Sequence, residues 1–153
     1  MVIQIDSREK AKAIKTIIST FEELGVDYYT SKLYTGDYMS LDNARLVVDR
    51  KQNLSEVCIN LCQDRPRFVR ELKRAQDAGI KIVFLIEHGR GYKTLEDVQK
   101  WVNPRSKVSP MAANGERLYR IMLALRNTYC IEWRFCTKAE TGKEIVKILG
   151  GDG

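Results

Sequence analysis

Two acidic residues and a lysine are spaced so that a β-hairpin would bring them together. Asp37 precedes a turn predicted at 42–44. Asp49 and Lys51 follow the turn, at the end of an apolar run. Pairing of residues whose numbers sum to about 86 would put Asp37 opposite or diagonal to Asp49, with Cβ atoms roughly 4.5–5.5 Å apart. Because side chains alternate along a strand, Asp49 and Lys51 would share one face and Arg50 would point to the other.

A pair of carboxylates this close needs a neutralising charge. Each would otherwise tend to protonate, because like charges repel. Mg²⁺ meets this need in proteins, where it is bound by one or two carboxylates together with water and substrate phosphates. The compact ammonium group of Lys51 would orient a water or hold a phosphate beside the metal. The spacing therefore predicts a metal-assisted phosphodiesterase centre, and the alternative is an exposed hairpin with ordinary surface charges.

The composition is that of one soluble globular domain. The 153 residues are 44% hydrophobic and 30% charged, which is enough for a single substantial core. No run approaches the roughly 18 apolar residues of a membrane span. Charged residues interrupt the first ten positions, so we expect no signal peptide and an intracellular protein without a membrane partner. A formal net charge of +6 favours a polyanionic partner, although a charge excess is also common on surfaces that bind nothing.

The four cysteines, Cys58, Cys62, Cys130 and Cys136, show no metal-binding spacing. Cys58 and Cys62 lie one helical turn apart among apolar residues, and the other two flank a predicted strand. Without a secretory context, reduced and packed thiols are the favoured interpretation over a zinc site or disulfides.

Alternating strands and helices predict an α/β fold of three layers, with helices on both faces of a central mixed sheet that is antiparallel at the hairpin. Besides the hairpin, strands are predicted at 2–5, 26–33, 81–87 and 131–135. Apolar residues recur at helical spacing over 14–24, 54–61, 68–75, 95–101, 118–125 and 145–149. The stretch 103–113 is predicted to be a loop, either a mobile flap over DNA or a connector.

Several polar residues near the hairpin have ordinary structural explanations. Asp6 with Glu9 fits a capping box at the start of a helix, and Glu56 fits the same role after Asn53. His88, which follows a buried strand, is interpreted as a loop residue, and the alternative is a general base.

The helix predicted after Asp64 has a strongly basic outer surface. Phe68 and Leu72 belong to its inner face, and the remaining positions hold five basic residues: Arg65, Arg67, Arg70, Lys73 and Arg74. Such a surface would suit contacts with DNA phosphates, and the alternative is a solvated face that binds nothing.

Taken in order, these motifs resemble the XPF/Hef-type structure-specific DNA endonuclease domain, a family with the restriction-endonuclease-like fold. The pattern of that family is a strand followed by Asp-x-Arg-Glu, a helix, Gly-Asp-Tyr and Glu-Arg-Lys-x-x-x-Asp. The chain has Asp-Ser-Arg-Glu at 6–9, Gly-Asp-Tyr at 36–38, Asp-Arg-Lys at 49–51 and Arg-Phe at 67–68. The match covers residues 2–87 in the right order.

The resemblance implies a nuclease site that binds Mg²⁺ or Mn²⁺. Asp37 and Asp49 would bind the metal together with the main-chain carbonyl of Arg50. Lys51 would hold the attacking water or the scissile phosphate.

The first motif would contribute the edge of this site. Asp6 and Glu9 would be further acidic groups there. Arg8 and Arg50 would contact phosphate or brace the acids.

Two positions depart from the family pattern. Asp49 stands where the family has glutamate, one methylene shorter but with the same carboxylate chemistry. Ser55 stands where the family has an aspartate, and the neighbouring Glu56 would point about 100° further round a helix. The acid of that position is therefore either absent or supplied by Glu56.

We therefore expect residues 1–153 to form a single nuclease domain, with a motif core at 2–87, a C-terminal strand and helices at 94–150, and no helix-hairpin-helix module. The predicted function is metal-dependent hydrolysis of branched, forked or flapped DNA by a standalone domain like those of phages and mobile elements. The resemblance also implies a homodimer. The alternatives are a catalytically inactive DNA-binding partner of an active nuclease, and a protein-interaction domain whose basic helix meets an acidic partner.

Overall fold

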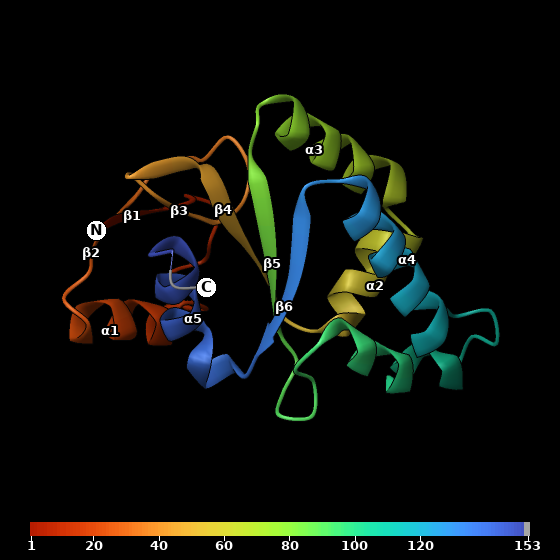
Figure 1. The fold of residues 1–153 in the computed structure, drawn as a ribbon. Helices are drawn as coiled ribbons and strands as arrows, with labels where there is room; N and C mark the ends of the chain where they lie inside the picture. The colour runs from red at the N-terminus through yellow and green to blue at the C-terminus, as the bar shows by residue number, and fades with distance from the viewer. Residues whose placement is uncertain (152–153) are drawn as a thin grey trace.

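A mixed six-stranded sheet forms the centre of the computed structural model, which describes residues 1–151 (Figure 1). The strands lie in the order β2-β1-β3-β4-β5-β6 and comprise β1 Val2–Ile5, β2 Asp27–Thr30, β3 Tyr38–Ser40, β4 Asn43–Lys51, β5 Lys81–Glu87 and β6 Ile131–Cys136. Strand β3 runs antiparallel to both of its neighbours, and the other neighbouring strands pair in parallel.

Helices cover both faces of this sheet (Figure 1). One face carries α1 Lys15–Glu23 and α5 Thr141–Leu149, and the other carries α2 Leu54–Cys62, α3 Arg65–Asp77 and α4 Gly115–Thr128. Three 3₁₀ turns occur in the connections: η1 Leu95–Lys100, η2 Pro104–Lys107 and η3 Lys138–Glu140. The predicted three-layer fold is therefore confirmed. None of the helices in residues 1–151 is long and apolar enough to cross a membrane.

Each face of the sheet has its own apolar core, because side chains alternate along the strands. Val48 and Leu85 join α1 and α5 on one face, whereas Val47 and Phe84 join α2, α3 and α4 on the other. Every residue of β5 from Ile82 to Ile86 is at most 2% exposed. The nearly unbroken apolar sequence of this strand is thus explained by burial on both faces.

The β3–β4 hairpin has the register that the sequence predicts. Tyr38 pairs with Val48 and Met39 pairs with Val47, so the numbers of these paired residues sum to 86. The register then shifts, and Ser40 pairs with Asn43, so the turn lies at 41–42 and the predicted turn at 42–44 is wrong. The main-chain N–H of Asp37 donates to the carbonyl of Val48 at 2.8 Å, which extends the pairing beyond β3. The carboxylates that follow this register on the two strands are thereby brought side by side.

The segment between β1 and α1 differs from the prediction, because α1 begins only at Lys15. Asp6 and Glu9 therefore do not cap a helix. The carboxylate of Asp6 instead accepts a hydrogen bond from the main-chain N–H of Leu33 at 2.8 Å. Strand β2 covers only Asp27–Thr30 of the predicted stretch 26–33, because it is an edge strand and its neighbour β1 ends at Ile5.

The long loop predicted at 103–113 contains the turn η2 and is pinned at both ends. Asn103 is 4% exposed, and its Nδ2 donates to the carbonyl of Ala113 at 2.9 Å. Its Oδ1 accepts from the main-chain N–H of Arg105 at 3.0 Å. Between these anchors Met111 is 85% exposed. Movement of this loop over DNA stays a prediction.

All four cysteines are free thiols, as predicted, but only Cys58 and Cys136 are buried. Cys62 and Cys130 are exposed, so the prediction of packed thiols is wrong for these two. Both exposed residues lie at the end of an element, since Cys62 ends α2 and Cys130 precedes β6, where the chain returns to solvent.

The turn into β3 requires glycine at position 36. Gly36 has φ +77°, and a Cβ there would lie 2.8 Å from Cγ2 of Val47. Gly36→Ala is therefore expected to lower the free energy of unfolding by roughly 2–4 kcal/mol, since left-handed strain and a clash against β4 add together. Gly79→Ala is the matched control in urea unfolding, because Gly79 has φ +71° and no atom within 4 Å of the added Cβ. Strain alone would cost about 1–2 kcal/mol there, and equal losses in both variants would contradict the clash.

Candidate active site

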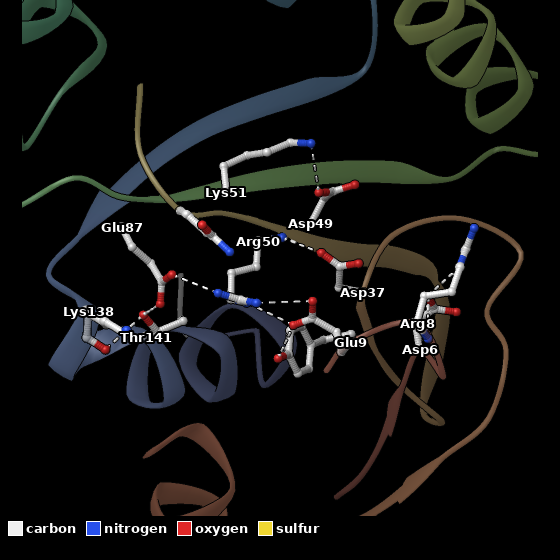
Figure 2. Close-up of polar contacts among 12 residues, drawn as sticks. Asp6, Arg8, Glu9, Asp37, Asp49, Arg50, Lys51, Glu87, Lys138 and Thr141 are labelled. Carbon is white, nitrogen blue, oxygen red and sulfur yellow. Dashed lines mark hydrogen bonds and ion pairs between the residues drawn. The ribbon is translucent and has the colours of Figure 1, made fainter. Parts of the chain in front are cut away.

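The polar residues predicted to form a site meet beside the end of β4 (Figure 2). They line a cleft of about 310 Å³. The lining residues are Asp6, Arg8, Glu9, Gly36, Asp37, Asp49, Arg50, Lys51, Gln52, Glu56, Arg67 and Glu71. The fold therefore brings together the acids and cations of all three sequence motifs, and adds groups from α2 and α3.

Two carboxylates on neighbouring strands form the centre of the cleft. Asp37 precedes β3, and its Oδ2 accepts a hydrogen bond from the main-chain N–H of Arg50 at 2.8 Å. Asp49 lies on β4, with its Oδ1 3.5 Å from Nζ of Lys51. Figure 2 shows the two acidic side chains next to each other, as the hairpin register requires.

Neither carboxylate carries a negative charge easily. Burial, reinforced by the charges of Asp49 and Glu9, raises the pKa of Asp37 to about 9. Burial also raises the pKa of Asp49, against the charge of Lys51 and together with that of Glu71. The pair is therefore short of positive charge, which a bound cation would supply.

This donor set fits a hard divalent cation. Within residues 1–151, no three Asp, Glu, His or Cys side chains are grouped so as to hold a metal ion by themselves. Mg²⁺ does not need such a group, because it commonly takes one or two carboxylates and completes its coordination with water and substrate oxygens. Asp37 and Asp49 match that requirement. The main-chain carbonyl of Arg50 stays a predicted further ligand.

Lys51 is held as a cation beside the acids. Its Nζ lies 5.8 Å from the ring centroids of both Phe68 and Phe84, and its side chain is 13% exposed. Burial opposes its charge, but Asp49 and Glu56 outweigh burial, and the pKa of Lys51 is raised above its ordinary value. An ammonium group of raised pKa donates hydrogen bonds and does not accept a proton. The geometry therefore suits the holding of a phosphate or a water and does not suit general-base chemistry.

Arg50 points to the opposite face of the sheet, where its guanidinium group is fully engaged (Figure 2). Its Nε and Nη2 donate to Glu9 at 2.9 and 3.3 Å, and its Nη1 donates to Glu87 at 3.0 Å. The side chain of Arg50 is 7% exposed. Of the two roles that the resemblance implies, the geometry favours bracing of the acids over contact with phosphate.

Two hydroxyl groups bind the acids that pair with Arg50, and we call Arg50, these acids and these hydroxyl groups together the Arg50 brace. The hydroxyl of Thr141 donates to Oε2 of Glu87 at 2.5 Å, and the hydroxyl of Tyr38 donates to Oε2 of Glu9 at 2.7 Å. Burial and the charge of Glu9 raise the pKa of Tyr38, so its proton is retained. Sequence reasoning missed Glu87 and Thr141. The one signal for Glu87 is a carboxylate at the end of an otherwise apolar strand, and Thr141 has none.

Asp6 and Arg8 form an ion pair at the rim of the cleft. The distance between Arg8 Nε and Asp6 Oδ2 is 2.7 Å, and the side chains are 64% and 1% exposed. Burial alone would raise the pKa of Asp6, but hydrogen bonds from Arg8 and Leu33 lower it below its usual value. Asp6 is therefore ionised and holds the segment that leads toward β3, while Arg8 faces solvent.

Glu56, which follows the position of the missing family acid, supports the start of α2. Its Oε1 accepts from the main-chain N–H of Gln52 at 2.7 Å, and its own N–H donates to Oδ1 of Asn53 at 2.9 Å. The predicted structural role of Glu56 is thus confirmed, although the residue also lines the cleft. Glu71 of α3 adds a carboxylate to the lining that no motif predicts.

All five basic residues of α3 are exposed, whereas Phe68 and Leu72 are buried, so the predicted basic outer surface is confirmed. Arg67 lines the cleft. Nε of Arg65 donates to a carbonyl in the last turn of α2 at 2.9 Å. Arg74 lies 4.1 Å from the ring centroid of Tyr34 and donates to the carbonyl of that residue. The two remaining basic residues are exposed: Arg70 and Lys73.

His88 supports a helix and does not line the cleft. Its Nδ1 accepts a hydrogen bond from the main-chain N–H of Leu54 at 2.9 Å. Burial lowers the pKa of His88, which keeps the imidazole neutral and able to accept. Because this nitrogen is occupied at the start of α2, the interpretation as a structural residue is favoured over a general base.

The model of the ERCC4 domain family matches residues 5–147 of the chain. The chain therefore belongs to the ERCC4 domain family. The XPF-type nuclease domain predicted from the ordered motifs is confirmed.

Solved structures with the same fold include XPF from Aeropyrum pernix, with a TM-score of 0.71 and 22% sequence identity over 99% of this chain and 65% of that chain. XPF from Aeropyrum pernix in complex with DNA matches with a TM-score of 0.67 and 22% identity, over 99% of this chain and 64% of that chain. The restriction-endonuclease-like fold is confirmed by these likenesses, and the chain spans less than two thirds of those structures. No curated protein sequence gives a match.

The ion pairs of Arg50 with Glu9 and Glu87 predict that removal of the Arg50 side chain lowers stability strongly. Arg50→Ala would leave Glu9 and Glu87 buried, 11% and 5% exposed, without their cation. Loss of one partner of a buried ion pair costs about 3–5 kcal/mol. Urea unfolding of the variant should therefore show a loss in this range.

Arg8→Ala is the matched control for this prediction. Arg8 also binds a buried carboxylate at 2.7 Å, but its side chain is 64% exposed. Removal of an exposed partner should cost no more than about 1 kcal/mol. Similar small losses in both variants would show that Arg50 does not brace the site.

The raised pKa of Asp37 predicts that replacement of its carboxylate stabilises the fold, and that this effect depends on pH. With a pKa of about 9 in place of 3.8, the folded protein retains a proton that the unfolded chain releases, so stability falls as pH rises between these values. In chelator, Asp37→Asn should raise the free energy of unfolding by roughly 1–3 kcal/mol at about pH 8, and by little at about pH 4. Asp42→Asn, in the exposed hairpin turn, is the control and should change nothing. Equal stability of wild type and Asp37→Asn across this range would refute the interpretation.

Proposed function

We propose that this protein is a metal-dependent DNA endonuclease that hydrolyses phosphodiester bonds in branched, forked or flapped DNA. The observation that carries the proposal is the buried pair Asp37 and Asp49 beside the charged Lys51, in a polar cleft on an ERCC4-family fold. This arrangement combines a place for a divalent cation with a cation of the protein at the position where a phosphate would enter.

In the proposed mechanism Asp37 and Asp49, with the main-chain carbonyl of Arg50, would hold Mg²⁺ or Mn²⁺. The bound ion would supply Lewis-acid chemistry at the phosphodiester. The ammonium group of Lys51 donates hydrogen bonds to the scissile phosphate or the attacking water, and offsets negative charge that grows in the transition state. The side chain of Arg50 does not touch the substrate in this mechanism: it fixes Glu9, while the main-chain N–H of Arg50 orients Asp37.

DNA is proposed as the substrate on the basis of charge and of the family. The net charge of +6 suits a polyanion. Arg8 and Arg67 border the cleft and are exposed, so both can meet phosphates next to the scissile bond. Phosphates further along the DNA would be met by the other exposed basic residues of α3, namely Arg65, Arg70, Lys73 and Arg74. One solved structure of the XPF protein contains DNA, which supports the same class of ligand.

A second candidate function is a catalytically inactive DNA-binding partner of an active nuclease. The observation in its favour is Ser55, which stands where the family pattern has an acid. Glu56 does not replace that acid freely, because its carboxylate caps α2. A homodimer is part of the first proposal, and a single species of monomer mass across micromolar concentrations in sedimentation would remove that part.

The proposal predicts cleavage of end-labelled flap, fork and four-way DNA in Mg²⁺ or Mn²⁺ and none in chelator. Asp37→Ala and Lys51→Ala should each reduce turnover at least about 10²-fold, the scale for loss of a major electrostatic element. Asp42→Ala is the matched control, since this acid lies in the same hairpin but outside the cleft, and it should cleave at the wild-type rate.

Two results would contradict the proposed active site or the proposed activity. Normal cleavage by Asp37→Ala or Lys51→Ala would place the active site elsewhere. Tight DNA binding without cleavage under any metal condition would favour the inactive DNA-binding partner.

A further inference from the structure

A second concave surface, separate from the catalytic cleft, lies along α4. It consists of a hollow of about 730 Å³ and a smaller one of about 260 Å³, which share the lining residues Met111, Ala112, Ala113 and Arg117. We call the two together the α4 groove. Neither hollow shares a lining residue with the catalytic cleft, although Arg65 of the groove is also one of the residues proposed to meet DNA phosphates away from the scissile bond.

The groove combines apolar side chains with a basic rim. Its apolar residues include Met111 and Pro110 from the loop and Ile121 from α4. Its charged residues are all cations: Arg65, Arg105, Arg117 and Arg120. Among the residues that line either hollow there is no acid and no aromatic ring. An occupant must therefore offer negative charge and apolar surface together.

These requirements discriminate between classes of anionic partner. Duplex DNA presents phosphates on its outside, whereas its thymine methyl groups lie inside the major groove, where a concave protein surface does not reach them. Single-stranded DNA gains much of its affinity from stacking of bases on aromatic side chains, and none lines the groove. An amphipathic helix whose apolar stripe is flanked by Asp and Glu offers both features at once.

We propose that the α4 groove binds an acidic amphipathic helix of a partner protein. Arg117, Arg120, Ile121 and Ala124 of α4 all line the groove. They occupy one side of the helix over about 10 Å, the rise of two turns. Acids one turn apart on the partner would face the two arginines. The 85% exposed thioether of Met111 would pack on its apolar stripe, as adaptable methionines do at binding surfaces.

Little in the unbound protein opposes this binding. Arg120 pairs with Glu116 at 3.5 Å, but its side chain is 70% exposed. An ion pair this exposed contributes no more than about 1 kcal/mol and can be exchanged for a partner carboxylate. Because the groove and the cleft are lined by different residues, a helix bound in the groove leaves the cleft open. The inference goes beyond the proposed nuclease function and does not depend on it.

The test is selection of a phage-displayed library of random peptides of about 16 residues against the full chain, long enough for a helix with i, i+4 and i+7 anchors. Enriched peptides should be acidic and carry apolar residues at this helical spacing. Fluorescein-labelled copies of them should bind with a dissociation constant on the order of micromolar in fluorescence anisotropy. Met111→Asp and Arg117→Glu should each weaken binding at least about tenfold.

Two matched variants control for folding and for net charge. Val108→Asp alters a residue that is as exposed as Met111, at 85%, on the same loop but outside the groove lining. Arg126→Glu reverses a charge on the same helix, also outside the groove. Both variants should bind the peptides as wild type does.

Four outcomes would overturn the proposal. The first is enrichment of neutral or basic peptides, or no enrichment at all. The second is undiminished binding of acidic peptides to Met111→Asp. The third is loss of labelled single-stranded or duplex DNA binding in Arg117→Glu but not in Arg126→Glu, which would make the groove a DNA surface. The fourth is a sedimenting dimer that Met111→Asp converts to monomer, which would make it a contact between two copies of this chain. Failure of DNA cleavage affects none of these readouts.

Discussion

Side-chain alternation at the end of β4 sets the electrostatics of the whole site. The last two residues of this strand are both cations, and they point to opposite faces of the sheet. Arg50 meets Glu9 and Glu87 on one face, whereas Lys51 meets Asp49 on the other. Because the two side chains leave the strand on opposite faces, neither cation can take over the contacts of the other, although Glu9 also lines the cleft and its charge helps to raise the pKa of Asp37.

The acids on the two faces of the sheet are neutralised to different degrees. On the face of Arg50, one guanidinium group and two hydroxyl groups satisfy two carboxylates. On the other face, Asp37 and Asp49 share a single ammonium group, and the pKa values of both acids are raised. Unbalanced buried charge lowers stability, and active sites commonly retain it because function requires it. Here the imbalance is what would make binding of a divalent cation favourable.

Sequence patterns within single elements correctly predicted the features that depend on neighbouring residues alone. The hairpin register, the cap at Asn53 and the buried strand β5 all follow from the residues within each element. Asp6 was misjudged because its carboxylate binds the N–H of Leu33, a distant contact that displaces the expected helix cap. Glu87 and Thr141 escaped notice for a similar reason, since they are 54 residues apart. The spacing within α3, by contrast, did predict that the outer surface of the helix is basic, since Phe68 and Leu72 are buried and the five basic residues are exposed.

The residues around Arg50 come from distant parts of the chain, so they are synthesised at different times. Glu9 is made early, Glu87 much later, and Thr141 only at the start of the last helix, α5. Until α5 has left the ribosome and packed beside α1, Glu87 has no hydroxyl partner and the guanidinium group of Arg50 lies under an incomplete layer. A nascent chain that already contains every acidic motif therefore still lacks the hydroxyl group that binds Glu87.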